Sequence, residues 1–443
     1  MRTLRILITN LYLKGRSGTE IVTMELAQGF VRRGHEVVVF SPQLGDSAAQ
    51  LIQQGVTVTD RLDQLEFEPE IIHGNHSVDL VQGLVAFPDV PGIFVCHNPD
   101  NWICSPPDIS RVRAFVSVDR VGSERIAHEL PRVRESVRIV HNAVDLECYH
   151  PRQPLPRGPK TALVLSKFSG CLPVIRAACA QAGLDVEAVG PGVDFEVDDL
   201  PRRLRNVDIV FATARMAIEA MAVGCAVILV DDRGLAGLVT DDVVNDWRED
   251  NFGRRLLTRE VTVDALVHEI LRYDATVGAL VAANVRSNNS LDRALSSYET
   301  IYMEAIGCHH PVDPRIEARE MSRLMRWWLP TISGIALSDP ARVQVGQARS
   351  TSPVAILLEQ IEKLTAALKE SDIDRSARLE SIQKLTAWLQ ESELDRHARL
   401  EQIHKLTALL NESELDRAEL HKQVRELTHR SRRRRSWFQR RPN

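Results

Sequence analysis

The chain has 443 residues, of which 44% are hydrophobic, and its formal net charge is −5. This length is enough for two domains and an appendage, and the charge excludes a protein that attracts nucleic acid through a global basic field. Seven cysteines are scattered without a CxxC or other metal spacing, so we expect reduced packing residues. The first apolar run is too short for a signal sequence, and no apolar stretch approaches the roughly 20 residues of a membrane span, which favours a cytoplasmic protein.

The chain begins with a pattern of strand, loop and helix. Leu4–Thr9 predicts a strand, and a loop of small residues leads into a helix over Thr19–Arg33. In a doubly wound sheet the loop after the first strand meets the ligand crevice. Gly15 and Gly18 permit close backbone approach and Thr19 can cap the helix, so exposed N–H groups there favour an anion or a polar sugar. A plain tight turn is the alternative.

Two later strands end in histidines. Glu70–His76 contains a short apolar strand with His73 and His76, and Gly92–Pro99 contains a buried strand that ends at His97. A histidine at the carboxyl end of a strand can hydrogen-bond a sugar hydroxyl or a phosphate, and it ionises near neutral pH. We select His97 as the acceptor-side candidate, and the alternative is a satisfied packing residue.

A proline-rich segment, Pro151–Pro159, predicts an extended linker between two domains, because its prolines forbid regular ladders. The alternation of strands and helices resumes at Thr161–Leu165 and continues through Val207–Phe211. Helical patterns then fill most of the chain up to Ile306.

The segment after Val207–Phe211 combines a helix, a buried strand and a turn. Arg215–Val223 predicts a helix that ends at Gly224, and Cys225–Val230 predicts a strand covered on both faces. Ligands of open parallel sheets lie beyond the carboxyl ends of the strands, so the glycine-containing turn at Asp231–Gly237 borders the expected crevice. Glu219 lies on an otherwise apolar helix. Because an unpaired buried carboxylate is costly, we expect Glu219 to face an open gap, where a ligand hydroxyl, a cation or water pairs with it.

The sequence Ile218–Gly224, IEAMAVG, resembles the donor-site signature of retaining glycosyltransferases of family four. The resemblance implies the glycosyltransferase-B fold of two Rossmann-like domains, in which Glu219 holds the ribose hydroxyls of a nucleotide sugar. The family carries a second Glu eight residues earlier, where this chain has Phe211. Gly15–Glu20 resembles the family's first loop, and His141–Asp145 resembles the segment that joins its two domains. The alternative is a capped surface helix in another parallel-sheet protein.

The resemblance also implies how a donor diphosphate is neutralised. The family places an Arg and a Lys in the loop after the first strand of the second domain, and only Lys167 stands there in this chain. Arg215 and Arg233 are the cations expected to assist, and a solvated lysine is the alternative for Lys167. The expected catalytic residues are His97 and Lys167. The expected donor-binding residues are Gly15, Gly18, Thr19, Lys167, Arg215, Glu219, Arg233, Gly234, Leu235, Ala236 and Gly237. We expect no cofactor beyond the donor substrate, and no residue cluster requires a metal.

The composition changes beyond Gly307. Ile316–Trp328 predicts an amphipathic helix whose apolar side packs on the catalytic body, with an anionic membrane interface as the alternative. The apolar side carries Ile316, Leu324, Met325 and Trp328.

A repeat of 21 residues, which equals three heptads, opens at Ile361, Ile382 and Ile403 and predicts a self-associating coiled coil. A lone charged helix is the alternative. The arginine-rich residues after His429 could bind acidic lipid headgroups, bind RNA nonspecifically or form a solubilising tail.

These patterns together predict an α/β fold with two Rossmann-like domains and a helical coiled-coil C-terminal extension. The predicted parts are an acceptor domain over 1–150, a nucleotide-sugar domain over 151–306, a linker with an amphipathic helix over 307–354, coiled-coil repeats over 355–430 and a basic tail over 431–443. The resemblance implies transfer of a sugar, with retention, from a nucleotide-sugar donor to a glycan, lipid or other acceptor in bacterial-type surface polysaccharide or glycoconjugate synthesis. We expect the chain to form homo-oligomers and to contact the inner face of the membrane peripherally. We expect no specific nucleic-acid partner. The alternative function is an inactive transferase-like scaffold, which Phe211 and the reduced phosphate loop favour.

Overall fold

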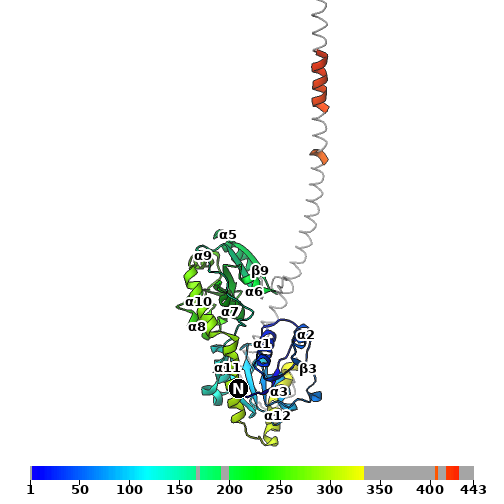
Figure 1. Cartoon of the computed structure of the whole chain (residues 1–443), viewed down its shortest axis with the longest axis vertical. Coiled ribbons are helices and arrows are strands. Elements are labelled where there is room, and N and C mark those ends of the chain that lie inside the picture. Colours follow the sequence, from blue (N-terminus) through cyan, green and yellow to red (C-terminus); the bar gives the residue numbers. More distant parts are fainter. Residues whose placement is uncertain (1, 166–169, 191–198, 334–404, 408–415, 429–443) are drawn as a thin grey trace, which may run out of the picture. The chain divides into compact units, whose positions relative to one another are not determined.

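The computed structural model describes residues 2–165, 170–190, 199–333, 405–407 and 416–428 (Figure 1). The chain divides into two units, Met1–Leu337 and Ser338–Asn443, and each is described by itself. No described helix is both long and apolar enough to cross a membrane.

The first sheet has seven parallel strands among the described residues, in the order β3-β2-β1-β4-β5-β6-β7. Its interior strand β1 (Arg5–Thr9) alternates its side chains between two covered faces: Ile6 and Ile8 pack in one core, and Leu7 packs in the other. Burial on both faces explains why the strands read as continuous apolar runs. The other strands are β2 (Glu36–Phe40), β3 (Thr57–Thr59), β4 (Ile71–Gly74), β5 (Gly92–Cys96), β6 (Val112–Ser117) and β7 (Arg138–Ile139).

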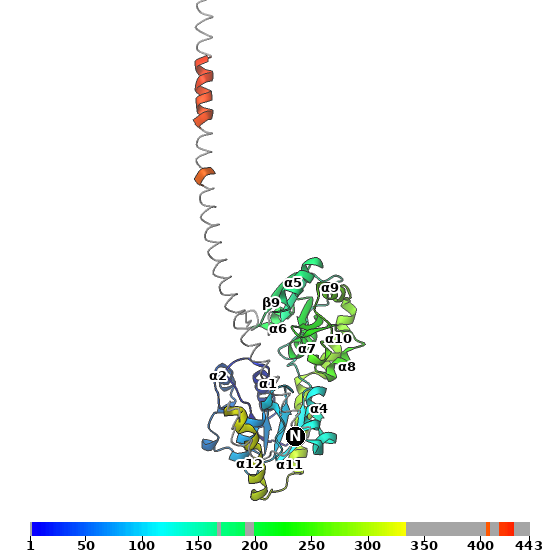
Figure 2. The same ribbon diagram turned by 180° about the vertical axis from the view of Figure 1, so that it is seen from behind.

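Helices cover both faces of this sheet (Figure 2). The α-helices between its strands are α1 (Gly18–Arg32), α2 (Asp46–Gln53), α3 (Ser77–Ala86) and α4 (Arg120–Glu129), and the short 3-10 helices are η1 (Leu62–Gln64), η2 (Trp102–Cys104) and η3 (Pro131–Ser136).

The second sheet has five described strands in the order β12-β11-β10-β8-β9. Its strands are β8 (Thr161–Leu165), β9 (Asp185–Val189), β10 (Ile209–Ala212), β11 (Ala226–Asp231) and β12 (Gly234–Leu238), of which β12 runs antiparallel to its neighbour. Its helices are α5 (Leu172–Gln181), α6 (Leu200–Leu204), α7 (Ala214–Val223), α8 (Val244–Glu249), α9 (Val263–Leu271) and α10 (Ala275–Asn288), with the 3-10 helix η5 (Arg254–Leu256). Helices α7 and α10 pack together, as do α5 and α9.

The predicted end of α7 is confirmed. Gly224 caps the helix at a φ of 104°, a left-handed conformation that glycine adopts at little cost. The prediction of a turn over Asp231–Gly237 is wrong, because the chain reverses within Asp232 and Arg233 and then forms β12.

Helix α11 (Leu291–Gly307) follows the second sheet in sequence but packs in the core of the first, through Leu295, Tyr298 and Tyr302. Gly29 of α1 permits this contact, since a Cβ there would lie 2.6 Å from Leu295. The second domain predicted over 151–306 therefore includes a helix that stabilises the first.

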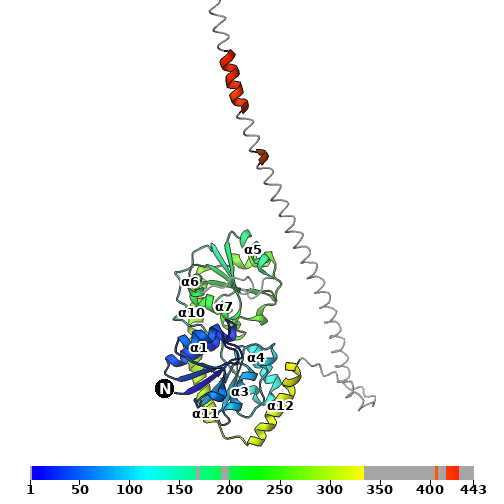
Figure 3. The same cartoon turned by 90° about the vertical axis from the view of Figure 1, so that its right-hand side faces the viewer.

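Helix α12 (Pro314–Ser333) also packs on the first sheet's half of the molecule (Figure 3). The predicted apolar contact is confirmed for Leu324 and Trp328, which join its core. It is wrong for Ile316 and Met325, whose exposed fractions are 48% and 52%.

In the second unit the described residues, 405–407 and 416–428, are helical and exposed. Leu420, Val424 and Leu427 form an exposed apolar stripe at the spacing of one helix face. Most of the predicted coiled-coil repeats and all of the basic tail lie outside the described residues, so both stay predictions.

Candidate active site

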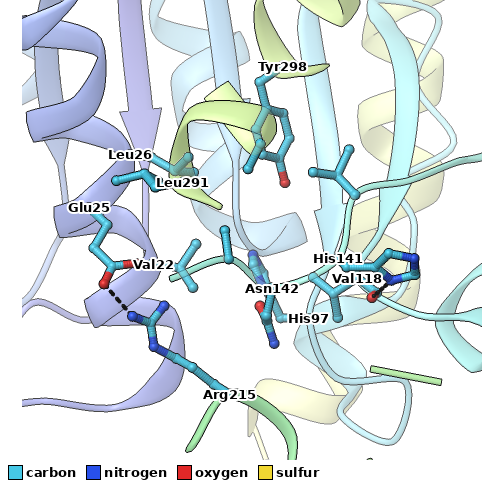
Figure 4. A pocket seen from close by; sticks show the side chains of 13 residues that line it. Val22, Glu25, Leu26, His97, Val118, His141, Asn142, Arg215, Leu291 and Tyr298 are labelled. Carbon is cyan, nitrogen blue, oxygen red and sulfur yellow. Dashed lines mark hydrogen bonds and ion pairs between the residues drawn. The ribbon is translucent and has the colours of Figure 1, made fainter. Parts of the chain in front are cut away.

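A pocket lies between α1, α11 and the beginning of α7, beside the carboxyl ends of β5, β6 and β7 (Figure 4). The empty space in the pocket, which is open to solvent, is about 310 Å³. Its polar lining residues are Glu25, His97, His141, Asn142, Arg215 and Tyr298, and its apolar lining residues are Val22, Leu26, Val118, Val140, Ala143, Leu291 and Ala294. The pocket thus brings together two predicted site residues that are distant in sequence: His97 directly follows β5 of the first sheet, and Arg215 lies on α7 beside the second sheet.

Arg215 is the buried cation of this pocket. Its Nε donates to Glu219 at 2.8 Å, as the i, i+4 spacing on α7 permits, and its Nη2 donates to Glu25 on α1. Its Nη1 is buried and has no hydrogen-bond partner among the described residues. Burial alone would lower the pKa of Arg215, but the two carboxylates outweigh it and raise that pKa, so the guanidinium stays charged.

Glu219 is 4% exposed and does not line the pocket. Its carboxylate pairs with Arg215 and also accepts a hydrogen bond from Tyr149, a residue of the segment that joins the two sheets. Burial raises the pKa of Glu219, and Arg215 opposes that rise. The expectation that Glu219 faces an open gap is therefore wrong, since neighbouring side chains satisfy it and it reaches the pocket only through Arg215.

His97 lines the pocket at the end of β5, and its Nε2 lies 2.8 Å from Oδ1 of Asn75. Burial lowers the pKa of His97 well below its usual value, and the nearby His76 and His73 lower it further. The expectation that His97 ionises near neutral pH is therefore wrong. A neutral imidazole can still hydrogen-bond a hydroxyl.

The other predicted histidines are fully or nearly fully buried. His73 bonds Tyr302 and Asn75, and His76 lies against Asp79.

A carboxylate of the chain itself occupies part of the first loop. The Glu20 carboxylate accepts from the backbone N–H groups of Lys14, Gly15 and Ser17 at 2.6, 2.8 and 2.7 Å. Ser17 is the N-cap of α1 and forms a capping box with Glu20, while Gly18 and Thr19 belong to the first turn. The predicted anion or sugar contact at the Gly15 N–H and the predicted cap at Thr19 are thus wrong, and the contact at Gly18 stays a prediction.

Lys167 lies outside the described residues. The positions just after it are described, and the N–H groups of Gly170 and Cys171 donate to Asp232 at 3.1 and 2.7 Å. Asp232, which the sequence reasoning did not select, therefore caps the beginning of α5.

Arg233 pairs with its neighbour Asp231 through three side-chain hydrogen bonds, and about half of the Arg233 side chain is exposed. It does not line the described pocket.

The predicted diphosphate-binding backbone, Gly234, Leu235, Ala236 and Gly237, lies in β12. Leu235 exchanges backbone hydrogen bonds with Arg259. A Cβ at Gly234 would lie 2.6 Å from the carbonyl oxygen of Leu257, and one at Gly237 would lie 2.6 Å from the Arg259 side chain. The expectation of an open phosphate loop here is wrong, because these glycines admit a neighbouring segment of the chain.

Phe211 is fully buried in β10 and packs in a core on one face of the second sheet. Three residues later, Ala214 begins α7 with a φ of 51°, an uncommon conformation for a residue with a Cβ. Its N–H donates to Phe252, which is itself left-handed at a φ of 50°. Sequence patterns carry no signal for this strained start of α7.

Within the described part of the chain, no group of three or more His, Cys, Asp or Glu residues is arranged to hold a metal ion.

Comparison with known proteins gives the family. A model described as Glycosyltransferase Family 4 matches residues 16–148. Residues 16–148 form a glycosyltransferase family 4 domain. This match confirms the predicted family for that part of the chain, and the chain is a glycosyltransferase.

Solved structures give the fold. The chain is similar to a glycosyltransferase from Rickettsia africae ESF-5, with 14% sequence identity and a TM-score of 0.50 over 70% of this chain and 100% of the other. It is also similar to Alr3699/HepE of Anabaena, crystallised with UDP and glucose, with 16% identity and a TM-score of 0.49 over 67% of this chain and 99% of the other. No curated protein matches the chain. The predicted glycosyltransferase-B fold is confirmed.

Proposed function

We propose that this glycosyltransferase moves a sugar from a nucleotide-sugar donor to a glycan, lipid or other acceptor, with retention, in bacterial-type surface polysaccharide or glycoconjugate synthesis. The observation that carries the proposal is the pocket that joins His97 of the family 4 domain to Arg215 beside Glu219 (Figure 4).

The pocket chemistry suits a ligand with many hydroxyl groups. Glu25 and neutral His97 supply hydrogen-bond acceptors, Arg215 Nη1 supplies an unused donor, and Asn142 can supply both. The apolar part of the lining, including Val22 and Leu291, suits the carbon face of a sugar ring. Two carboxylates already balance Arg215, so a bare anion is a poorer match than a polyol.

Departure of a nucleoside diphosphate requires positive charge that is already in place. A buried guanidinium stabilises developing negative charge more strongly than an exposed one, because water does not screen it. Arg215 lies in the pocket, but Glu25 and Glu219 already balance its charge, so it can contribute a hydrogen bond from Nη1 and a second cation must supply the net positive charge. Lys167 remains the second proposed cation, and Glu219 the proposed ribose ligand, which would share its carboxylate with Arg215.

A panel of nucleotide sugars should identify the donor through thermal stabilisation, since a ligand at a hundred times its dissociation constant adds about 2.7 kcal/mol. With that donor, we expect acceptor-dependent release of the nucleoside diphosphate. Glu219→Ala should weaken donor affinity in calorimetry, and Glu260→Ala, at an exposed site of the same half, should leave it unchanged. Equal affinity in a folded Glu219→Ala protein would remove Glu219 from the donor site.

One observation favours the alternative, an inactive scaffold. Phe211 lies in a hydrophobic core, so the position of the family's second Glu offers no carboxylate to a ligand. A scaffold would bind a nucleotide sugar without releasing a nucleoside diphosphate under any acceptor tested. Acceptor-dependent release therefore rejects it.

The proposed partners beyond donor and acceptor are a second copy of the chain and an anionic membrane surface. The exposed stripe of Leu420, Val424 and Leu427 supports self-association through 355–430. Light scattering of the full chain should give an oligomer that is lost after truncation at 333. The membrane proposal rests on the basic sequence 431–443, and sedimentation with anionic liposomes should fall when these residues are deleted. An unchanged mass or unchanged sedimentation would reject the respective proposal.

A further inference from the structure

A chain of hydrogen bonds connects α11 to the pocket through three buried or half-buried side chains. The Tyr302 hydroxyl lies 2.7 Å from Nδ1 of His73, and Nε2 of His73 lies 3.3 Å from Oδ1 of Asn75. The same Oδ1 lies 2.8 Å from Nε2 of His97. Two histidines from neighbouring strands therefore share one amide oxygen.

The orientation of the Asn75 amide is determined by its other partners. Its Nδ2 donates to the carbonyl oxygen of Thr9 at 3.2 Å and to the Thr23 hydroxyl at 3.0 Å. A carbonyl oxygen can only accept, so the amide nitrogen must face Thr9 and the amide oxygen must face the histidines. Asn75 has no exposed surface, which prevents exchange of these partners with water.

An amide oxygen also only accepts, so both imidazoles must carry a proton on Nε2. Burial lowers the pKa of His73, with Asn75 opposing it, and burial together with His76 and His73 lowers that of His97. Both rings are therefore neutral, and their Nδ1 atoms are acceptors. Nδ1 of His73 accepts from Tyr302, whereas Nδ1 of His97 has no hydrogen-bond partner among the described residues.

We propose that Asn75 is a positioning residue that holds His97 as the Nε2–H tautomer, so that Nδ1 accepts a hydrogen bond from a hydroxyl group of the sugar or acceptor in the pocket. This inference rests on the proposed function for its ligand. Asn75 does not line the pocket itself, and it acts through its hydrogen bond to His97.

The tautomer can be tested without turnover. Nitrogen NMR of the full chain with labelled histidine, assigned through a His97→Gln sample, should show a protonated Nε2 and an unprotonated Nδ1 for His97. Asn75→Leu removes the acceptor oxygen and should give a mixture of tautomers, whereas Tyr302→Phe should leave His97 unchanged because it removes only the bond to His73. A protonated Nδ1 in the wild type, or an unchanged pattern in a folded Asn75→Leu protein, would overturn the assignment.

Binding then tests the role of the tautomer. Loss of one hydrogen bond between neutral groups should weaken donor or acceptor binding about 2- to 10-fold in Asn75→Leu. In the double variant with His97→Ala, Asn75→Leu should add no further loss, because Asn75 acts through His97. Additive losses would assign Asn75 a merely structural role. If no sugar ligand binds at all, the proposed function fails. The NMR measurement still tests the tautomer of His97, because it needs no ligand.

Discussion

Replacement of Arg215 by Met is the sharpest test of how the two halves of the site are connected. The exposed fractions of the side chains are 10% for Arg215, 16% for Glu25 and 6% for Glu219, so the variant would leave two carboxylates with little water and no cation. Removal of one partner from a buried ion pair costs about 3–5 kcal/mol, because the other charge stays buried. We expect a loss in this range near neutral pH.

The loss should depend on pH in a definite direction. Burial already raises the pKa of Glu219 above its usual value of 4.5, and Arg215 is the main group that opposes the rise. Without Arg215 the folded-state pKa rises further. A carboxyl group with a raised folded-state pKa contributes stability that is complete below the unfolded pKa and is lost as the pH rises through the folded value. The Arg215→Met protein should therefore lose less stability relative to wild type at pH 5 than at pH 8.

Urea unfolding followed by circular dichroism at pH 5 and pH 8 measures both effects. Arg255→Met is a matched control, because Arg255 of the second domain also pairs with a glutamate of the first, Glu124, but both side chains are about half exposed, at 47% and 58%. An exposed pair contributes about 0–1 kcal/mol, so this control should change little at either pH. Adding Glu25→Gln to Arg215→Met should recover part of the loss. Equal losses in the two arginine variants, or a loss independent of pH, would refute the assignment of Arg215 as the charge that supports both carboxylates.

Two further predictions concern elements that support the site. Glu317→Ala should destabilise the first domain by about 3–5 kcal/mol in urea unfolding, because Arg111 is 1% exposed and loses the Glu317 carboxylate of α12. The control Arg323→Ala, on the exposed face of the same helix, should change the free energy of unfolding by no more than about 0.5 kcal/mol. Equal effects would mean that α12 does not neutralise Arg111. Glu20→Gln should cost about 1–3 kcal/mol at pH 7, because three N–H groups lose an ionised acceptor. Burial would raise the pKa of Glu20, but these hydrogen bonds outweigh it and lower that pKa, so the stability from Glu20 is present above the unfolded pKa and is lost as the pH falls through the lowered folded-state pKa. The difference between wild type and variant should therefore shrink as the pH falls, and a difference independent of pH would contradict this origin.

The alternation of strands and helices could be predicted because each strand is short, apolar and covered on both faces. The run at Cys225–Val230 corresponds to β11 within one residue at each end, and Gly224 ends α7 as its chemistry requires. Strand β12 was missed because a Gly-Leu-Ala-Gly-Leu sequence lacks the β-branched residues typical of strands. Its glycines are required by the close approach of residues 257–259, a contact that no local pattern reveals.

The partners of the site residues could not be predicted, since they are distant in sequence. Glu25 meets Arg215 across 190 positions, and Tyr302 meets His73 across 229. The i, i+4 spacing of Arg215 and Glu219 permits their contact on one helix face, which the sequence analysis did not use, and the third member of their network comes from another domain. The role of Glu20 could have been predicted from the sequence. Ser17 and Glu20 have the spacing of a capping box, in which the glutamate binds backbone N–H groups.

The different exposure of two carboxylates supports the proposal that an anionic donor binds in the second domain. In each domain a carboxylate accepts from backbone N–H groups at the loop before a helix: Glu20 does so before α1, and Asp232 does so before α5. Glu20 is 3% exposed and bonds three N–H groups, so a phosphate could replace it only by opening the loop. Asp232 is exposed and can turn toward solvent, which frees the N–H groups of Gly170 and Cys171 for a phosphate oxygen at little cost. The described loop before α1 therefore accepts a phosphate less readily than the beginning of α5, which is why we propose that the donor phosphates bind in the second domain.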